Sequence, residues 1–209
     1  MENKIYKHPY YGEINYVVHI DDKLKGKENL PMLIFLHGAG ERGHDHEKLF
    51  VHGPLKYLRN GSINVPGIVI CPQCPDEYVW VNLAPMLKEF INEMADQYKA
   101  DKSRISISGI SMGGYGTWEM IMFAPELFYK AAPVCGGGTP WRASRIKAQV
   151  WAFHGDVDTV VPPKNSYEMI DAMRNSGQNP RFTVFNGVNH NSWEPAYEDT
   201  RVIDWLFED

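Results

Sequence analysis

The chain has 209 residues, of which 44% are hydrophobic, 22% charged and 12% aromatic. This composition excludes a disordered or collagen-like chain, and the length favours a single domain over residues 1–209. The formal net charge of −5 gives no electrostatic footprint for nucleic acid or an anionic membrane surface. The longest apolar runs have the length of a strand, far below the roughly 20 residues of a membrane span. We therefore expect a small-molecule substrate, no nucleic-acid partner and no membrane partner.

The number of cysteines indicates the redox state of the cellular compartment. There are only three, Cys71, Cys74 and Cys135, too few and odd in number for a disulfide framework. The first residues, 1–9, contain no apolar segment typical of a secretory signal. A cytoplasmic location is therefore predicted. Cys71 and Cys74 have the spacing of a redox motif, but Pro75 and a polar loop follow where a helix would begin, so we interpret them as structural.

Apolar patterning predicts strands that alternate with helices along the chain. The predicted strands span residues 14–20, 32–36, 67–71, 104–108, 130–135, 149–154 and 181–185. The predicted helices span 47–58, with an interruption at Gly53-Pro54, then 83–98, 113–123, 163–176 and 194–207. This alternation indicates the α/β class, a mostly parallel twisted sheet with helices on both faces. In such sheets the chemistry lies in loops at the carboxyl ends of strands.

The segment 109–113 (GISMG) matches the G-x-S-x-G pattern of a nucleophile elbow. It lies between a predicted buried strand and a predicted helix, as that motif requires. Glycines two positions before and after Ser111 are needed because the turn is so sharp that side chains there would collide with neighbouring strands. Ser111 is therefore the predicted nucleophile, and the alternative is an ordinary glycine-rich turn.

A serine hydroxyl needs a neighbouring base and an acid to become nucleophilic. With this type of elbow, the acid and then the histidine follow the serine along the chain. Only His154 and His190 lie after Ser111, and only His190 has both a candidate acid and a further strand between itself and the serine. His190 is thus the predicted base, whereas His154 is expected to be a buried hydrogen-bonding residue that fixes its loop.

Two aspartates compete for the acid. Asp156 and Asp158 both follow the predicted strand 149–154, whereas the other acidic residues between Ser111 and His190 fall in predicted helices or just after one. Asp158 is the preferred acid. The alternative for either aspartate is a residue of the turn ahead of the next helix, and we expect one of the two to have that role.

The remaining site residues are expected in loops near strand exits. Met112, directly after the nucleophile, and Ala39 are predicted to donate backbone N–H groups to an oxyanion, with Gly40 as the second choice in that loop and a predicted substrate contact. At least one tryptophan is expected to wall the substrate pocket, and the candidates are Trp80, Trp141 and Trp193. No metal and no cofactor is expected, because serine chemistry needs neither.

The chain resembles small serine esterases of the α/β-hydrolase superfamily. It is similar to lidless carboxylesterases, acyl-protein thioesterases and related predicted peptidases that resemble the catalytic domains of prolyl oligopeptidases. The segments that carry the resemblance are 37–43 (HGAGERG), 109–114 (GISMGG), 154–162 (HGDVDTVVP) and 190–193 (HNSW). The resemblance implies Ser111, Asp158 and His190 as a catalytic triad, and it supports Asp158 because the acid of the family occupies the fifth position of the third segment.

A function follows as an expectation from these residues and from the resemblance. We expect a serine esterase that hydrolyses short-chain or aryl carboxylic esters through an acyl-enzyme. The alternatives are a peptidase or thioesterase with the same triad, or a binding protein that has kept the fold and lost activity. Residues 136–148, where many members of the superfamily insert a helical lid, are too few for a lid domain, so we expect an open site.

Overall fold

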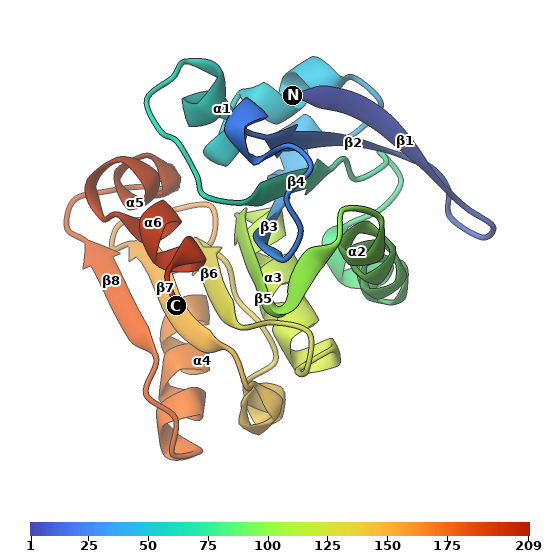
Figure 1. Ribbon diagram of the computed structural model, residues 1–209. Coiled ribbons are helices and arrows are strands. Elements are labelled where there is room, and N and C mark those ends of the chain that lie inside the picture. Colours follow the sequence, from blue (N-terminus) through green and yellow to red (C-terminus); the bar gives the residue numbers. More distant parts are fainter.

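The computed structural model describes residues 1–209 and contains one eight-stranded sheet (Figure 1). The strands are β1 (Glu2–His8), β2 (Gly12–Ile20), β3 (Leu30–Leu36), β4 (Ile68–Pro72), β5 (Ala100–Ile110), β6 (Lys130–Val134), β7 (Gln149–Gly155) and β8 (Arg181–Phe185). Their order across the sheet is β1-β2-β4-β3-β5-β6-β7-β8. β2 pairs antiparallel with β1 and β4, and every other pair is parallel. The prediction of a mostly parallel α/β sheet is confirmed.

Six α-helices connect or flank the strands. They are α1 (Pro54–Arg59), α2 (Ala84–Gln97), α3 (Met112–Phe123), α4 (Lys164–Asn175), α5 (Trp193–Asp199) and α6 (Val202–Phe207). Short 3-10 helices occur at Asp22–Leu24, Ala39–Glu41, His46–Phe50, Trp80–Leu83 and Pro140–Arg145. None of the helices combines the length and the apolar character that crossing a membrane demands.

The sheet carries a hydrophobic core on each face. In β3, Met32, Ile34 and Leu36 belong to the core on the side of α2, α3 and α4, whereas Leu33 and Phe35 belong to the core on the side of α1, α5 and α6 (Figure 1). A strand with both faces covered needs apolar residues at every position, because successive side chains point to opposite faces. The continuous apolar run in the sequence is therefore the direct cause of the central position of β3.

Two predicted helices are interrupted in the structure. The predicted helix 47–58 divides into a 3-10 segment and α1 because Gly53 has a φ of +71°, and a Cβ there would lie 2.1 Å from the Phe35 ring. The predicted helix 194–207 was wrong as a single element. It divides into α5 and α6 at Arg201, whose φ of +58° is left-handed and turns the chain so that α6 can pack on the sheet.

The first strand, β1, was not predicted. Its sequence, ENKIYKH, has few apolar residues, and Ile5 is 52% exposed. β1 exists because its backbone pairs with β2 from Glu2 to His8 at the edge of the sheet. Backbone pairing leaves little signal in the side chains of an edge strand, so apolar periodicity did not reveal it.

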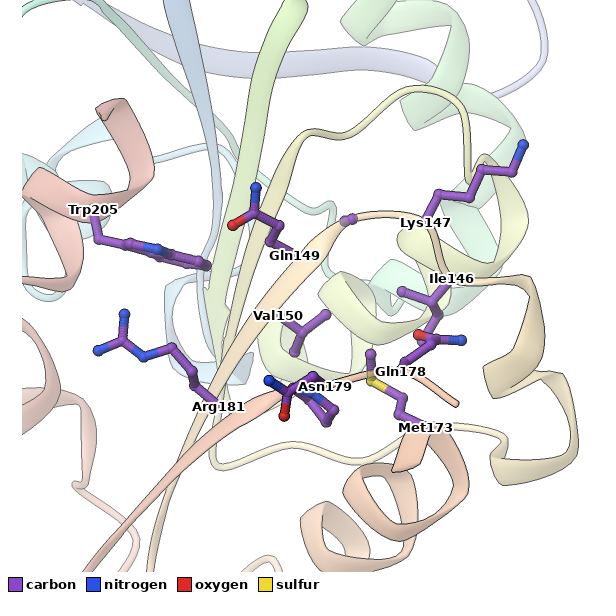
Figure 2. Close-up of a pocket in the computed structure, with 11 residues that line it drawn as sticks. Ile146, Lys147, Gln149, Val150, Met173, Gln178, Asn179, Arg181 and Trp205 are labelled. Atoms are coloured by element: carbon purple, nitrogen blue, oxygen red, sulfur yellow. The ribbon is translucent and has the colours of Figure 1, made fainter. Parts of the chain in front are cut away.

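A hollow of about 330 Å³ lies at the amino ends of β7 and β8, on the edge of the sheet opposite Ser111 (Figure 2). Gln149, Asn179 and Arg181 line it together with Trp205 of α6. The guanidinium carbon of Arg181 lies 3.4 Å from the centroid of the Trp151 ring. Open α/β sheets bind substrates beyond the carboxyl ends of their strands, so this hollow lies outside the region where the fold places its chemistry.

The closeness of α3 to the sheet generates a stability prediction. A Cβ on Gly113 would lie 1.9 Å from the carbonyl oxygen of Leu36, whereas a Cβ on Gly40 would meet no atom within 4 Å. Gly113→Ala should therefore lower the free energy of unfolding by about 3 kcal/mol, and Gly40→Ala by less than about 1 kcal/mol. Urea unfolding of both variants beside the wild type measures this. Equal stability of the two variants would contradict the prediction.

Candidate active site

Ser111 occupies the single residue between the end of β5 and the start of α3. Its backbone has φ 53° and ψ −115°, a conformation that residues with a side chain rarely adopt. The strain is enforced by close packing, because a Cβ on Gly109 would lie 2.4 Å from the carbonyl oxygen of Gly113. The strand and the helix therefore meet backbone to backbone, and Ser111 projects its hydroxyl from the turn.

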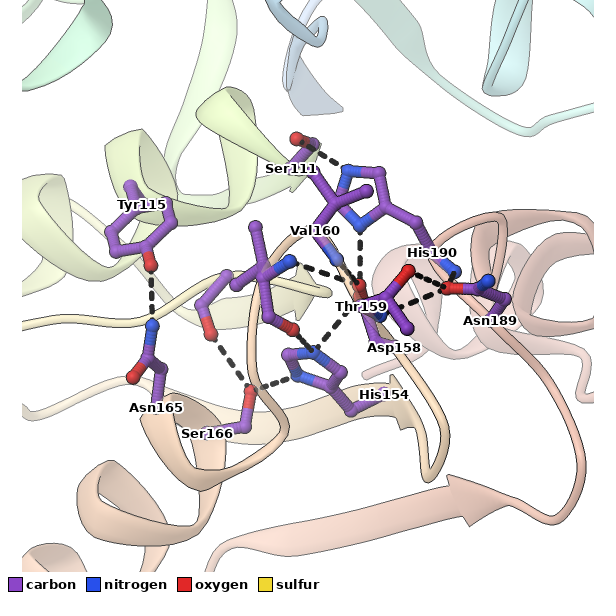
Figure 3. A network of polar contacts seen from close by, with 12 residues as sticks. Ser111, Tyr115, His154, Asp158, Thr159, Val160, Asn165, Ser166, Asn189 and His190 are labelled. Carbon is purple, nitrogen blue, oxygen red and sulfur yellow. Dashed lines mark hydrogen bonds and ion pairs between the residues drawn. The ribbon is translucent and has the colours of Figure 1, made fainter.

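His190 lies in the loop between β8 and α5, beside Ser111 (Figure 3). Its Nδ1 is 2.8 Å from Oδ2 of Asp158, and its Nε2 is 2.9 Å from Oγ of Ser111. An ionised carboxylate only accepts, so Nδ1–H donates to Asp158 and Nε2 accepts from the Ser111 hydroxyl. The structure thus brings the three predicted triad residues into one chain of hydrogen bonds.

Asp158 follows β7 and has a fully buried side chain. Its Oδ1 accepts the backbone N–H groups of Val160 and Val161, both at 2.9 Å. Its Oδ2 accepts from His190 and also lies 3.2 Å from Nε2 of His154. Burial opposes the charged form, but the hydrogen bonds from His190 and the two N–H groups outweigh it and lower the pKa of Asp158 below its usual value. The carboxyl is therefore ionised at neutral pH.

The loop after β7, which contains Asp158, and the loop after β8, which contains His190, are joined by hydrogen bonds. Oδ1 of Asn189 accepts from the backbone N–H of Thr159 at 2.9 Å and of His190 at 2.8 Å. A Cβ on Gly155 would lie 2.2 Å from the carbonyl oxygen of Val188, so only glycine lets the loops approach. Asp156, the competing acid, accepts from the N–H of the glycine at position 187 and does not contact His190.

The two predicted oxyanion donors each begin a helix. Met112 begins α3 and Ala39 begins a 3-10 helix, and the first N–H groups of a helix have no partner within it. His37, two residues before Ala39, anchors this loop to the segment after β4, because its Nε2 accepts from the N–H of Cys74 at 2.9 Å. Burial lowers the pKa of His37 to about 4, so this histidine is a neutral structural residue.

A second hollow, also of about 330 Å³, lies against Ser111. Its lining is almost entirely apolar, and the lining residues other than Ser111 are Val79, Trp80, Val81, Met112 and Tyr115. Val79, Val81 and Tyr115 were not predicted as site residues. Val79 directly precedes the 3-10 helix Trp80–Leu83, which follows β4, and Val81 lies within it, so both flank the predicted Trp80. Tyr115 lies one helical turn after Ser111, so the 3.6-residue period of α3 could have revealed it.

The predicted tryptophans take three different positions. Trp80 borders this hollow but is fully buried, and its Nε1–H donates to the carbonyl oxygen of His37 at 2.9 Å. Trp193 packs edge to face on His190, with ring centroids 5.4 Å apart. Trp141 is 83% exposed on the 3-10 helix after β6 and does not line the hollow, and neither does Gly40.

Cys135 lies beneath the triad at the end of β6. Its Sγ, an oxygen of Asp158 and a ring nitrogen of His190 all lie within 4.8 Å of one another, which is close enough for metal ligands. Burial raises the pKa of the Cys135 thiol to about 12, so it is protonated at neutral pH, and metals bind thiolates. A metal ion would also have to replace the hydrogen bond between His190 and Asp158, so this donor set suits a triad better.

The chain is similar in sequence and structure to several known hydrolases. Residues 138–208 match the prolyl oligopeptidase family. The chain is 22% identical over 191 residues to poly(3-hydroxyalkanoate) depolymerase C of Paucimonas lemoignei, over 83% of this chain and 44% of the depolymerase. Among solved structures, a thermostable esterase superposes with a TM-score of 0.89 and 34% identity, over 99% of this chain and 62% of the esterase. The chain thus spans less than two thirds of each of these two relatives.

A feruloyl esterase module from Clostridium thermocellum superposes with a TM-score of 0.73 and 17% identity, over 99% of this chain and 84% of the module. At that identity the likeness concerns the fold. The strand order of the sheet, the turn with Ser111 between β5 and α3, and these similarities all indicate the same fold. The chain therefore has the α/β-hydrolase fold.

Proposed function

We propose that the protein is a serine carboxylesterase that cleaves short-chain or aryl carboxylic esters through an acyl-enzyme. The observation that carries this proposal is the chain of hydrogen bonds from Ser111 through His190 to Asp158, beside an apolar hollow. A serine with an accepting imidazole at 2.9 Å has the geometry of an activated nucleophile. The similarity to a thermostable esterase supports ester bonds as the target.

The acylation step follows from the positions of these atoms. Oγ of Ser111 attacks the ester carbonyl carbon while its proton passes to Nε2 of His190. The resulting imidazolium is stabilised by the ionised carboxylate of Asp158. The oxyanion is held by the N–H groups of Met112 and Ala39. Collapse of the tetrahedral intermediate breaks the bond to the alcohol oxygen, which takes the proton from His190 and leaves.

Deacylation repeats these roles with water as the nucleophile. His190, now neutral, accepts a proton from a water molecule that attacks the carbonyl carbon of the acyl-enzyme. The second tetrahedral intermediate expels Oγ of Ser111, which regains its proton from His190. A carboxylic acid leaves and the starting state returns, so the cycle consumes one ester and one water and requires no further reactant.

The hollow beside Ser111 supports an apolar acyl group of moderate size. Its volume of about 330 Å³ lies near the lower end of typical small-molecule sites. The aromatic ring of Tyr115 and the side chains of Val79 and Val81 favour short aliphatic or aryl groups over charged ones. The feruloyl esterase module was solved with sinapinate, an aromatic acid, which is in keeping with an aryl group in this position.

A peptidase is the second candidate. The match of residues 138–208 to the prolyl oligopeptidase family favours it, because that region contains Asp158 and His190. The same triad can cleave amides or thioesters when the leaving group fits. A substrate panel therefore has to include peptides and thioesters beside esters.

We further propose a cytoplasmic location and a small-molecule ester as the substrate. All three cysteines are buried and unpaired, which is in keeping with a reducing compartment.

The substrate panel tests the proposed function directly. We expect p-nitrophenyl acetate, butyrate and feruloyl esters to be hydrolysed, and thioester and peptide substrates to be cleaved more slowly. Ser111→Ala should abolish turnover and labelling by a fluorophosphonate probe, because no other group can form the acyl-enzyme. Activity that survives Ser111→Ala would overturn the mechanism, and a preference for peptides would favour the second candidate.

The two aspartates should differ sharply. Asp158→Asn should lower kcat for p-nitrophenyl acetate by about a thousandfold or more, because the amide cannot hold the imidazolium that forms. Asp156→Asn should change kcat by less than about tenfold, since the amide oxygen can still accept from the N–H of Gly187. Steady-state kinetics of both folded variants measure the difference, and the reverse ranking would reassign the acid.

The hollow beside Ser111 leads to a prediction about which acyl groups the protein accepts. Val81 is 41% exposed and lines the hollow, so Val81→Trp should fill part of it. The ratio of kcat/KM for the octanoate ester to that for the acetate ester should fall by about tenfold. Ile5→Trp, at a 52% exposed position on the edge strand β1, is the matched control and should leave the ratio unchanged. An unchanged ratio in Val81→Trp would place the acyl group elsewhere.

A further inference from the structure

A second histidine contacts the acid of the triad. His154 lies near the end of β7 and is completely buried, and none of the steps above uses it. Its Nε2 is 2.9 Å from the carbonyl oxygen of Val161 and 3.2 Å from Oδ2 of Asp158, and its Nδ1 is 2.7 Å from Oγ of Ser166. Figure 3 shows Asp158 between the two imidazoles, with His190 on one side and His154 on the other.

The partners of His154 determine which nitrogen carries its proton. The Val161 carbonyl and the Asp158 carboxylate can only accept, so Nε2 is the protonated nitrogen. Burial lowers the pKa of His154 in spite of these two acceptors, so the ring is neutral at neutral pH. Nδ1, which then carries no proton, lies 2.7 Å from Oγ of Ser166 in α4, and the single proton of that hydroxyl is shared between Nδ1 and the carbonyl oxygen of Gly136 at 2.9 Å. The buried ring is thus fixed in one tautomer and one orientation.

This donor completes the coordination of Asp158. Two backbone N–H groups occupy Oδ1, and His190 and His154 share Oδ2. The ionisable groups that face Asp158 are His154 from β7, His190 from the loop before α5, and Cys135 from the end of β6. Ser111 and the Trp193 ring are the other neighbours of His190 in this network. A donor to Oδ2 withdraws negative charge from the atom that His190 contacts.

We propose that His154 is a positioning residue of the triad, whose Nε2–H holds Oδ2 of Asp158 toward His190 and limits how readily His190 takes up a proton. The inference rests on the proposed esterase function. It assigns to the buried histidine a role beyond fixing its loop. Without its N–H, the carboxylate is oriented by one donor fewer, which lowers kcat/KM, and Oδ2 presents more negative charge to a protonated His190, which raises the acid limb.

Three variants separate this role from packing. His154→Phe keeps the ring volume and removes the donor, whereas His154→Gln keeps an N–H near the position of Nε2. Val161→Ala removes apolar packing from the same turn but leaves its backbone N–H and carbonyl in place. If His154→Phe does not fold, Ser166→Ala serves instead, because it removes the hydrogen bond at Nδ1 that helps to orient the His154 ring toward Asp158.

The readouts are the pH profile of kcat/KM with p-nitrophenyl acetate and NMR titration of labelled histidine, which follows His190 without turnover. In His154→Phe we expect kcat/KM to fall about 10- to 100-fold and the acid limb to move up by about 0.5 to 1 pH unit. Ser166→Ala should shift it less, in the same direction. In His154→Gln and Val161→Ala the acid limb of the pH profile should stay at the pH of the wild type.

Each outcome decides between the two proposals. An acid limb and a His190 titration in folded His154→Phe equal to those of the wild type would overturn the positioning role, as would an equal shift in Val161→Ala. If the wild type hydrolyses no substrate but the NMR titration of His190 still moves in His154→Phe, the esterase proposal fails and the contact through Asp158 stands.

Discussion

On either side of the turn between β5 and α3, at Gly109 and Gly113, backbone packs directly on backbone and leaves no room for a Cβ atom. Gly109 and Gly113 bring the first turn of α3 within van der Waals contact of the ends of β3 and β5. This contact forces Ser111 into a left-handed conformation and frees the N–H of Met112 at the start of the helix. Both the proposed nucleophile and one proposed oxyanion donor therefore depend on a single steric constraint, and the other loops of the candidate site are arranged around one hydroxyl.

Asp158 and His190, the proposed acid and base, reach that hydroxyl because β7 and β8 are adjacent parallel strands that end at the same edge of the sheet. Gly155 lets the two following loops approach, and Asn189 ties them together. Within this junction Asp158 is stripped of water, yet it stays ionised because donors surround both of its oxygens. The charge that the imidazolium of His190 requires is thus maintained in a dry environment.

Much of the architecture was predictable because it is local. The buried strands β3 and β7 are marked by continuous apolar runs, β5 by the alternation of Ile105 and Ile107 with serines, the break before α1 by Gly53, and the strained turn by its glycines. Features that depend on neighbours were not predictable. β1 is formed by backbone pairing with β2 and by the packing of Tyr6 on Phe90. The break between α5 and α6 depends on the packing of α6 on the sheet. Val79 and Val81 line the hollow because the 3-10 helix Trp80–Leu83 packs against α3.

The sequence alone determined the order of strands and helices, the position of the serine turn, and the chain order of serine, acid and histidine, because these follow from residue type and spacing along the chain. Only the tertiary structure decided between Asp156 and Asp158 as the partner of His190, left Trp141 in solvent, and placed His154 against the acid. Each of these outcomes depends on how side chains pack in three dimensions, and the pairing of His190 with Asp158 depends on two loops that are remote in sequence but follow the adjacent strands β7 and β8.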